Sequence, residues 1–199
     1  MLLPPEDHKD YVGNGVPGNL VIDTRNPPKI PFSEESIEFH AARILLLLKY
    51  VGGRKSKIVG RTKLAKLDFF ARYPVYLNKA ASIRNFEIHS KTIVRPESPM
   101  IRYRYGPWDK KYYNIFALLI SKGLIEIKSS KDGDVFELTK RGNYAVSEMQ
   151  GAEFAPLIER CQLISDIFGG ETGSGIKKFI YENFPEIVSL KLGEEINKL

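Results

Sequence analysis

Hydrophobic residues recur at helical spacing in the first half of the chain. They predict a first core helix that is capped by Ser33 and ends near Val51. A second helix is expected to begin near Arg61, after a Gly-Gly stop and a basic loop. Pro74 is expected to interrupt this helix or to begin a short continuation, because proline suits a first helical turn but not an interior. The pattern from Ser82 to Met100 is irregular.

The most informative segment runs from Gly106 to Val146. It predicts a helix over Asp109 to Lys122, followed at Gly123 by a change from the helical period to the alternation of a strand. Lys131-Asp132-Gly133 is typical of a hairpin turn, and Thr139 is the expected cap of the next helix. This order is typical of the recognition helix and wing of a winged-helix domain. We therefore predict an α+β, mostly helical fold with a winged-helix core and a two-stranded wing.

The flanking segments extend this core on both sides. Residues 1–32 are rich in proline and glycine and predict an extended N-terminal arm, and residues 33–150 form the winged-helix-like domain. Residues 151–199 are expected to be a C-terminal helical extension. Helices are expected at Ala145–Met149, Phe154–Phe168 and around Ile176–Ile180. The pattern leaves open whether these appended helices offer a partner surface or complete the core.

Basic residues are concentrated in one region. The net charge is +6, and the segment from Val51 to Lys111 holds fifteen Lys and Arg against four acids, whereas acids outnumber bases by eight to five from Gly151 onward. Such a balance suits an acidic partner, of which nucleic acid is the commonest. Three basic clusters could together form one positive face: Arg54, Lys55, Lys57, Arg61 and Lys63; Arg102 and Arg104; and Lys110 and Lys111.

The predicted recognition helix and wing carry the remaining candidate binding residues. Lys110, Lys111 and Asn114 could contact DNA from the helix, with Lys128 and Lys131 in the wing. A solvated helix face explains the same residues equally well. Aromatic residues, Trp108 among them, interleave with these cations between residues 103 and 113. They have the composition of an interface hot spot or of a core cluster beneath the helix.

No pattern of catalytic or metal-binding residues is visible. The three histidines are far apart, the single Cys161 lies in an apolar helical pattern, and no nucleophile motif occurs. Gly170 and Gly175 have phosphate-loop spacing, but the lysine that follows is displaced by one position. We therefore predict no enzyme activity, cofactor or metal. The absence of a long apolar run or a signal sequence, together with one thiol, predicts a cytoplasmic protein without membrane contact.

Two segments carry a family resemblance. The stretch GRTKLAKLDFFARYPVYLNKA (Gly60–Ala80), then RYRYGPWDKKYY and the wing, resemble middle components of bacterial ABC-three-component systems, the Lamassu-type phage-defence family. The resemblance covers residues 33–150, and LDFFARYPVYL is its most specific part. It implies a small non-enzymatic subunit that binds an SMC-like coiled-coil ATPase and a separate effector, often a nuclease. On that basis Lys63–Tyr76 and Trp108–Tyr113 are the expected partner contacts.

Two functional hypotheses follow. The first is an accessory subunit that bridges the ATPase and the effector, and it leaves contact with DNA open. The alternative is a stand-alone winged-helix transcription regulator, which would be a homodimer that binds half-sites one helical turn apart.

Overall fold

The first core helix is capped by Ser36. A computed structural model describes residues 36–87 and 99–196, so the predicted N-terminal arm lies outside the described residues. Helix α1 spans Ile37–Val51, and the Ser36 hydroxyl accepts a hydrogen bond from the Phe39 amide at 3.1 Å. The predicted cap at Ser33 is therefore wrong by one helical turn, because Ser36 is the residue whose extended backbone and hydroxyl close the first turn. The predicted end of the helix at Val51 is confirmed.

Pro74 begins a new helix rather than kinking the second one. Helix α2 spans Arg61–Arg72 and α3 spans Pro74–Ile83. Tyr73 between them leaves the helical region, with φ −115° and ψ 81°, because the proline that follows disfavours a helical backbone there. The two helices share an aromatic core in which the ring centroids of Phe69 lie 5.0 Å from those of both Tyr73 and Tyr76.

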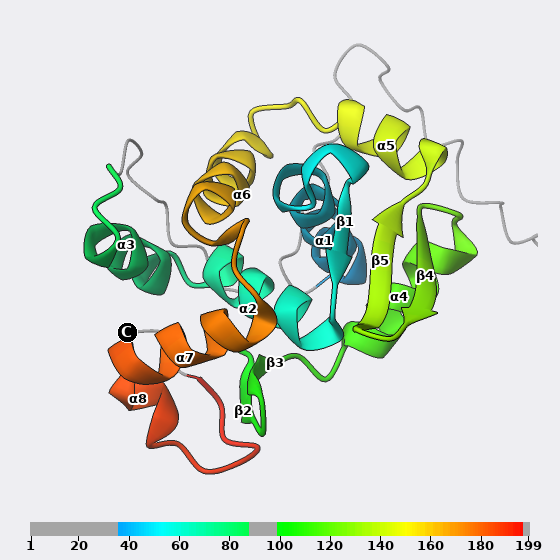
Figure 1. Cartoon of the computed structure of the whole chain (residues 1–199). Helices are drawn as coiled ribbons and strands as arrows, with labels where there is room; N and C mark the ends of the chain where they lie inside the picture. Colours follow the sequence, from blue (N-terminus) through cyan, green and yellow to red (C-terminus); the bar gives the residue numbers. More distant parts are fainter. Residues whose placement is uncertain (1–35, 88–98, 197–199) are drawn as a thin grey trace, which may run out of the picture. The chain divides into compact units, whose positions relative to one another are not determined.

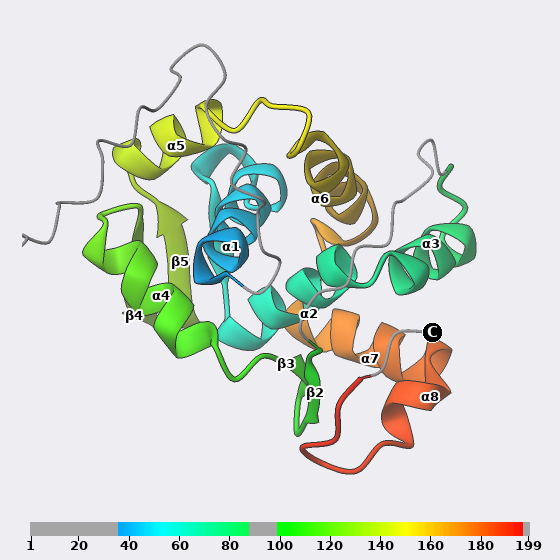
Figure 2. The ribbon, with the colours of Figure 1, turned by 180° about the vertical axis from the view of Figure 1, so that it is seen from behind.

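A three-stranded antiparallel sheet follows the order β1–β5–β4. Strands β4 (Ile125–Ser130) and β5 (Gly133–Leu138) form the predicted hairpin, with Lys131 and Asp132 in its turn. Strand β1 (Lys57–Val59) pairs with β5 and was not expected, because three residues are too few to show an alternating pattern. Helices α1 and α4 lie behind this sheet in Figure 1 and in front of it in Figure 2.

A second, smaller hairpin precedes the predicted recognition helix. Strands β2 (Ile101–Tyr103) and β3 (Gly106–Trp108) pair through a two-residue turn, and Gly106 adopts the positive φ of 119° that closes it. Helix α4 spans Tyr112–Ser121. It begins three residues later than predicted, because the Asp109 carboxylate accepts a hydrogen bond from the Lys111 amide at 2.7 Å before the first helical turn.

The C-terminal helices are part of the core. Helix α5 spans Lys140–Ser147 and is capped by Thr139, so the predicted start at Ala145 is five residues too late. Helix α6 (Ala155–Phe168) packs on α1 and α2 through the predicted stripe that includes Leu157, Cys161 and Ile164. The Phe168 ring stacks on Phe70 at 4.5 Å. Residues on both sides of position 151 therefore share one core.

Helices α7 (Gly173–Asn183) and α8 (Pro185–Val188) complete the described chain. A short 3-10 helix, η1, spans Gly53–Lys55. The fold is α+β and mostly helical, with small antiparallel sheets. Among the described residues no helix has the length and apolar character needed to cross a membrane.

Candidate interaction surface

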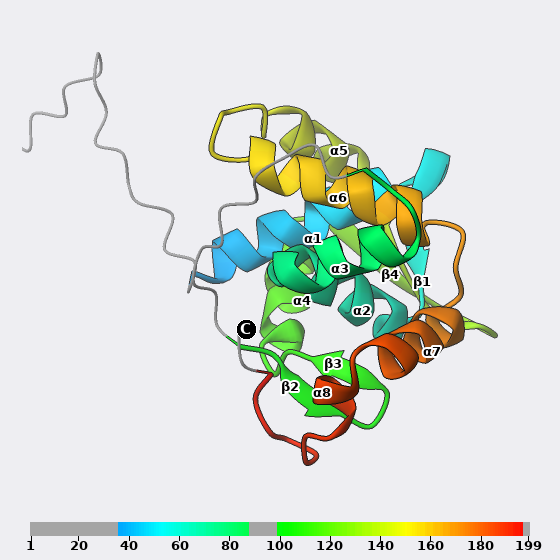
Figure 3. The same ribbon diagram turned by 90° about the vertical axis from the view of Figure 1, so that its left-hand side faces the viewer.

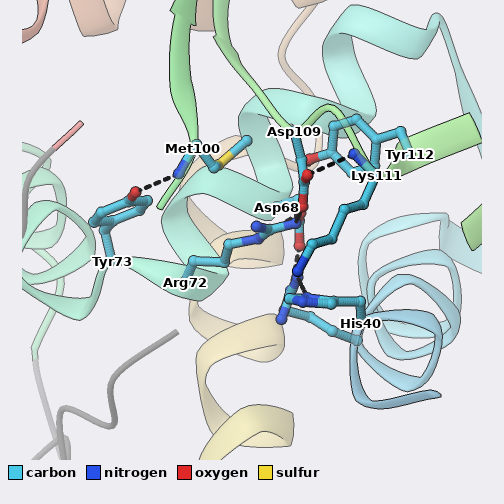
Figure 4. A network of polar contacts seen from close by, with 9 residues as sticks. His40, Asp68, Arg72, Tyr73, Met100, Asp109, Lys111 and Tyr112 are labelled. Carbon is cyan, nitrogen blue, oxygen red and sulfur yellow. Dashed lines mark hydrogen bonds and ion pairs between the residues drawn. The ribbon is translucent and has the colours of Figure 1, made fainter. Parts of the chain in front are cut away.

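A buried network of charged side chains fixes the start of α4. Asp68 of α2 lies at its centre and accepts hydrogen bonds from Arg43 Nε at 2.5 Å, from Arg72 Nε at 3.0 Å and from the Tyr112 hydroxyl at 2.7 Å. Arg72 also pairs with Asp109 at 2.5 Å. Figure 4 shows Asp68 and Arg72 of α2 meeting Asp109, which precedes α4, and Tyr112, the first residue of α4. Two guanidinium groups are thus matched by two carboxylates out of contact with water.

Burial and charge set the protonation states of this network. Burial alone would raise the pKa of Asp68, but the charges of Arg43 and Arg72 outweigh it and hold that pKa well below its usual range. Burial, reinforced by the nearby arginines, lowers the pKa of His40 to about 3. His40 is therefore neutral at physiological pH, and its Nδ1 accepts a hydrogen bond from Arg43 Nη2 at 2.8 Å. The network thus links α1, α2 and the start of α4 through buried side chains.

Four aromatic residues form a continuous row on the surface, which we call the aromatic strip: Tyr103, Tyr105, Trp108 and Tyr113. Successive ring centroids lie 6.5 Å apart for Tyr103–Tyr105, 5.8 Å for Tyr103–Trp108 and 6.3 Å for Trp108–Tyr113. Tyr105 is 47% exposed and Tyr113 is 61% exposed. Tyr112, by contrast, is a core residue under the helix. The core hypothesis is therefore confirmed for Tyr112, and the interface hypothesis stays a prediction for the exposed rings.

Cations sit against the rings of the strip at both ends. Arg61 lies 5.5 Å above the Tyr113 ring, Arg104 lies 5.6 Å from the Tyr105 ring, and Lys177 of α7 lies 5.7 Å from that same ring. These are cation–π distances. Arg61 is also paired with Asp134 of β5, so its charge is balanced. Figure 3 shows the β2–β3 hairpin between α4 on one side and α7 on the other.

The outward side of α4 carries a second exposed surface, which we call the α4 face: Lys110, Tyr113, Asn114, Ala117 and Ile120. Ile120 is 48% exposed, a large fraction for an aliphatic side chain. From Lys110 to Leu124 the sequence has no Asp or Glu. The α4 face is therefore a mixed apolar and basic surface.

The predicted basic residues fall into two groups. Lys57 lies opposite Glu137 at one end of β1, beside Arg54 and Lys55, whereas Arg61 lies near Asp134 at the other end. Lys131 is in the turn of the β4–β5 hairpin, at the Arg61 end. Arg102 and Arg104 lie in β2 and the turn that follows it, and Lys110 and Lys111 directly precede α4. The first of the three predicted clusters therefore spans both ends of β1.

Two of the predicted cations, Lys128 and Lys63, are less available to bind a ligand. Lys128 pairs with Glu126 at 2.7 Å and lies 4.0 Å from Glu137, so the open side of the sheet carries mixed charge. Lys63 is half-buried beside Gly173 of α7, and burial lowers its pKa. Both observations weaken the predicted role of these side chains as phosphate contacts.

Sequence reasoning missed three contributors to this region. Lys177 and Tyr181 belong to a helix far along the chain, and no local pattern connects them with the hairpin. Lys66 lies beneath the hairpin, where its Cε would be 3.4 Å from a Cβ added at Gly106. Burial, together with the charge of Lys177, lowers the pKa of Lys66 to about 8. A lysine between Ala65 and Leu67 in an apolar helix was the available signal for the last of these.

The class defined by the described residues is a small α+β protein with an exposed aromatic and basic surface. They contain no group of three or more His, Cys, Asp or Glu side chains placed to hold a metal ion. Comparison with protein-family models, with curated proteins and with solved structures found no match.

Proposed function

We propose that this chain is a non-catalytic winged-helix adaptor that binds a protein partner through the α4 face. On this proposal it is the accessory subunit of an SMC-like ATPase defence complex and joins the ATPase to an effector such as a nuclease. The enzymatic chemistry of the complex belongs to those partners.

The order of elements supports the winged-helix part of the proposal. Without α3 and the β2–β3 hairpin, the chain reads α1, β1, α2, α4, β4, β5, and its sheet order is β1–β5–β4. A winged-helix domain has this order of three helices and a three-stranded sheet, with the hairpin as its wing. Helix α4 then occupies the position of the recognition helix, and α3 with the small hairpin is an insertion before it.

The composition of the α4 face is the observation that carries the choice of a protein partner. DNA-reading helices present polar side chains to base edges, whereas Ile120, Ala117 and Tyr113 are apolar or aromatic and point to solvent. Exposed apolar residues next to aromatic and basic ones are typical of protein interfaces. The open side of the wing supports the same choice, because Glu126 and Glu137 would repel phosphates.

The resemblance of Gly60–Ala80 and the RYRYGPWDKKYY segment to middle components of ABC-three-component systems supports the identity of the partners. Most of the specific block LDFFARYPVYL is buried and contains Asp68 and Arg72. Its role on this proposal is to build the network that holds α4, and the partner contact falls to the α4 face.

Co-expression with the neighbouring genes, followed by size-exclusion chromatography with mass determination, tests the adaptor function. We expect co-elution with a coiled-coil ATPase and an effector. The double variant Lys110→Glu/Lys111→Glu and the single variant Ile120→Glu should each abolish co-elution. The matched control is Lys140→Glu/Arg141→Glu, which reverses an adjacent exposed basic pair on α5 and should leave the complex intact.

The alternative function predicts a different result. A solitary homodimer that retains a specific duplex fragment, and loses it only in the Lys110→Glu/Lys111→Glu variant, would identify a transcription regulator and reject the adaptor. Thermal unfolding of each variant separates loss of binding from loss of folding.

A further inference from the structure

We propose that the aromatic strip, together with Arg104 and Lys177, binds single-stranded nucleic acid. This site lies mainly on the β2–β3 hairpin and shares only Tyr113 with the α4 face. The inference does not require that the chain assemble with an ATPase.

The rings of the strip leave faces available for stacking. Tyr103 and Trp108 project from the same side of the hairpin, because Ile101 pairs with Trp108 and Tyr103 pairs with Gly106. The interplanar angles are 69° for Tyr103–Tyr105, 36° for Tyr103–Trp108 and 59° for Trp108–Tyr113. No pair is parallel, so no two of these rings are stacked face to face. Separate, differently tilted platforms suit bases that can splay apart.

The cations of the strip are placed for a phosphate backbone. Arg104 is in the turn of the hairpin and Lys177 reaches it from α7, and both lie within 6 Å of the Tyr105 ring, at 5.6 Å and 5.7 Å. Neither cation has an ion pair with a carboxylate among the described residues. Sites that bind single strands combine aromatic rings, on which bases stack, with positive charges that meet the phosphates.

Two further features favour an anionic ligand at this end of the strip. Lys177 also contacts the Tyr181 ring at 5.2 Å, which extends the row of rings and cations onto α7. Lys66 is buried directly beneath the hairpin, and its ammonium group donates to the Thr62 carbonyl at 2.9 Å. Lys66 therefore lies against β3 at Gly106, and Lys177 lies at the turn beside Tyr105. Two acidic residues, Glu194 and Glu195, pair through their backbones with the edge of β2 that faces away from β3.

A duplex is a poor ligand for this arrangement. Its bases are already stacked on one another and cannot be spread over four rings from three elements without loss of pairing. Single strands make this contact at no such cost, and stacking tolerates any base because each has a π-face. We therefore expect little sequence preference and a clear preference for single strands.

The chain contains its own probe for this contact. Trp108 is the only tryptophan in the sequence and lies in the middle of the strip. Titration of the full chain with unlabelled dT15 at about 50 mM salt should quench its fluorescence, and anisotropy of labelled dT15 should give the same dissociation constant. A 15-base-pair duplex should bind at least about tenfold more weakly than dT15, because unstacking a duplex costs a few kcal/mol.

Matched substitutions test the residues. The double variant Tyr103→Ala/Tyr105→Ala should weaken dT15 binding at least about tenfold, as expected for the loss of one or more stacked bases. Tyr144→Ala is its control, because that ring on α5 is 68% exposed and far along the chain from the strip. Lys177→Ala should reduce the slope of log K against log salt by about 0.7, whereas Lys178→Ala, on the next residue of α7, should leave it unchanged.

The outcomes separate this inference from the adaptor proposal. Ile120→Ala, on the α4 face, should leave dT15 binding unchanged, so a result on one surface does not decide the other. The inference is rejected if the wild-type chain does not quench with dT15, if the duplex binds equally well, or if the Tyr103→Ala/Tyr105→Ala variant binds within twofold of wild type while it remains folded.

Discussion

Tyr112 and Tyr113 are neighbours in the sequence and belong to two different kinds of charged aromatic cluster. Tyr112 is 1% exposed and lies 5.9 Å from the buried Arg72, whereas Tyr113 is 61% exposed and lies 5.5 Å from Arg61. In the buried network each guanidinium is held by carboxylates. In the aromatic strip, Arg104 and Lys177 have rings but no carboxylate among the described residues.

This difference shows what each cluster can do. Buried charges without partners would be very costly, so a network such as that around Asp68 must be internally balanced, and it stabilises one arrangement of helices. Solvent-exposed cations need no such balance and can exchange water for an anionic ligand. The same residue types therefore form a buried, balanced network around Asp68 and a solvent-exposed row in the aromatic strip.

Removal of the central carboxylate gives the largest expected effect. Asp68→Asn leaves Arg43 and Arg72 without their shared counter-charge in a buried place. We expect it to lower the free energy of unfolding by about 3 to 5 kcal/mol, measured by urea denaturation. Asp166→Asn, on the exposed side of α6, is the control and should change stability by less than about 0.5 kcal/mol. Equal effects of the two substitutions would contradict the buried network.

Acidification should destabilise the fold through His40. Its pKa in the folded protein is about 3, below the ordinary value of 6.5, so below pH 6.5 the unfolded chain binds a proton that the folded chain does not. Stability is complete above pH 6.5 and should fall by about 2 to 3 kcal/mol by pH 4.5. The lowered pKa of Asp68 adds a further loss below its own ordinary value of 3.8.

The variant His40→Asn isolates this contribution. Its amide oxygen can replace Nδ1 as the acceptor for Arg43, and it does not titrate. As the pH falls from 6.5 to 4.5, the free energy of unfolding should decrease in the wild type through His40 but not in the variant. The difference between the two free energies should therefore become smaller. A difference that stays constant over this pH range would mean that His40 binds protons equally in the folded and the unfolded chain.

The smallest effect compares the two neighbouring tyrosines directly. Tyr112→Phe removes the hydroxyl that donates to Asp68 at 2.7 Å and should cost about 1.5 to 2 kcal/mol of stability. Tyr113→Phe removes a hydroxyl that accepts from Arg61 at 3.3 Å on the surface and should cost less than about 0.5 kcal/mol. Thermal unfolding of the pair measures both. Similar losses of stability in the two variants would contradict the distinction between the buried network and the aromatic strip.

The parts that local pattern predicts well are the ones built from local contacts. The β4–β5 hairpin, the Thr139 cap and the apolar stripe of α6 depend on residues close together in sequence, and the predictions of all three are confirmed. The β2–β3 hairpin was missed because three-residue strands show no period. The buried network was missed because its members come from three separate segments and each reads locally as a surface charge.

The candidate surface was predicted only in part. One short segment contains Arg104, Trp108 and Lys110, so their grouping is visible in the sequence. Lys177 contacts the Tyr105 ring from more than seventy positions along the chain, and no periodicity reports such a contact. Arg61 has the charge that the sequence indicates, but its pairing with Asp134 depends on how β1 and β5 meet.

The edge of β2 that faces away from β3 has a consequence for the order of events during synthesis. The Arg102 amide donates to the Glu194 carbonyl at 2.8 Å, and the Tyr73 hydroxyl accepts from the Met100 amide at 2.8 Å while it donates to the Ile196 carbonyl at 3.0 Å. Strand β2 therefore cannot complete these hydrogen bonds until a segment about ninety residues later in the chain has been made. At roughly 5 to 20 residues per second, a ribosome needs several seconds to supply it. Throughout that interval residues 101–108 have been made, but the segment that hydrogen-bonds to β2 has not.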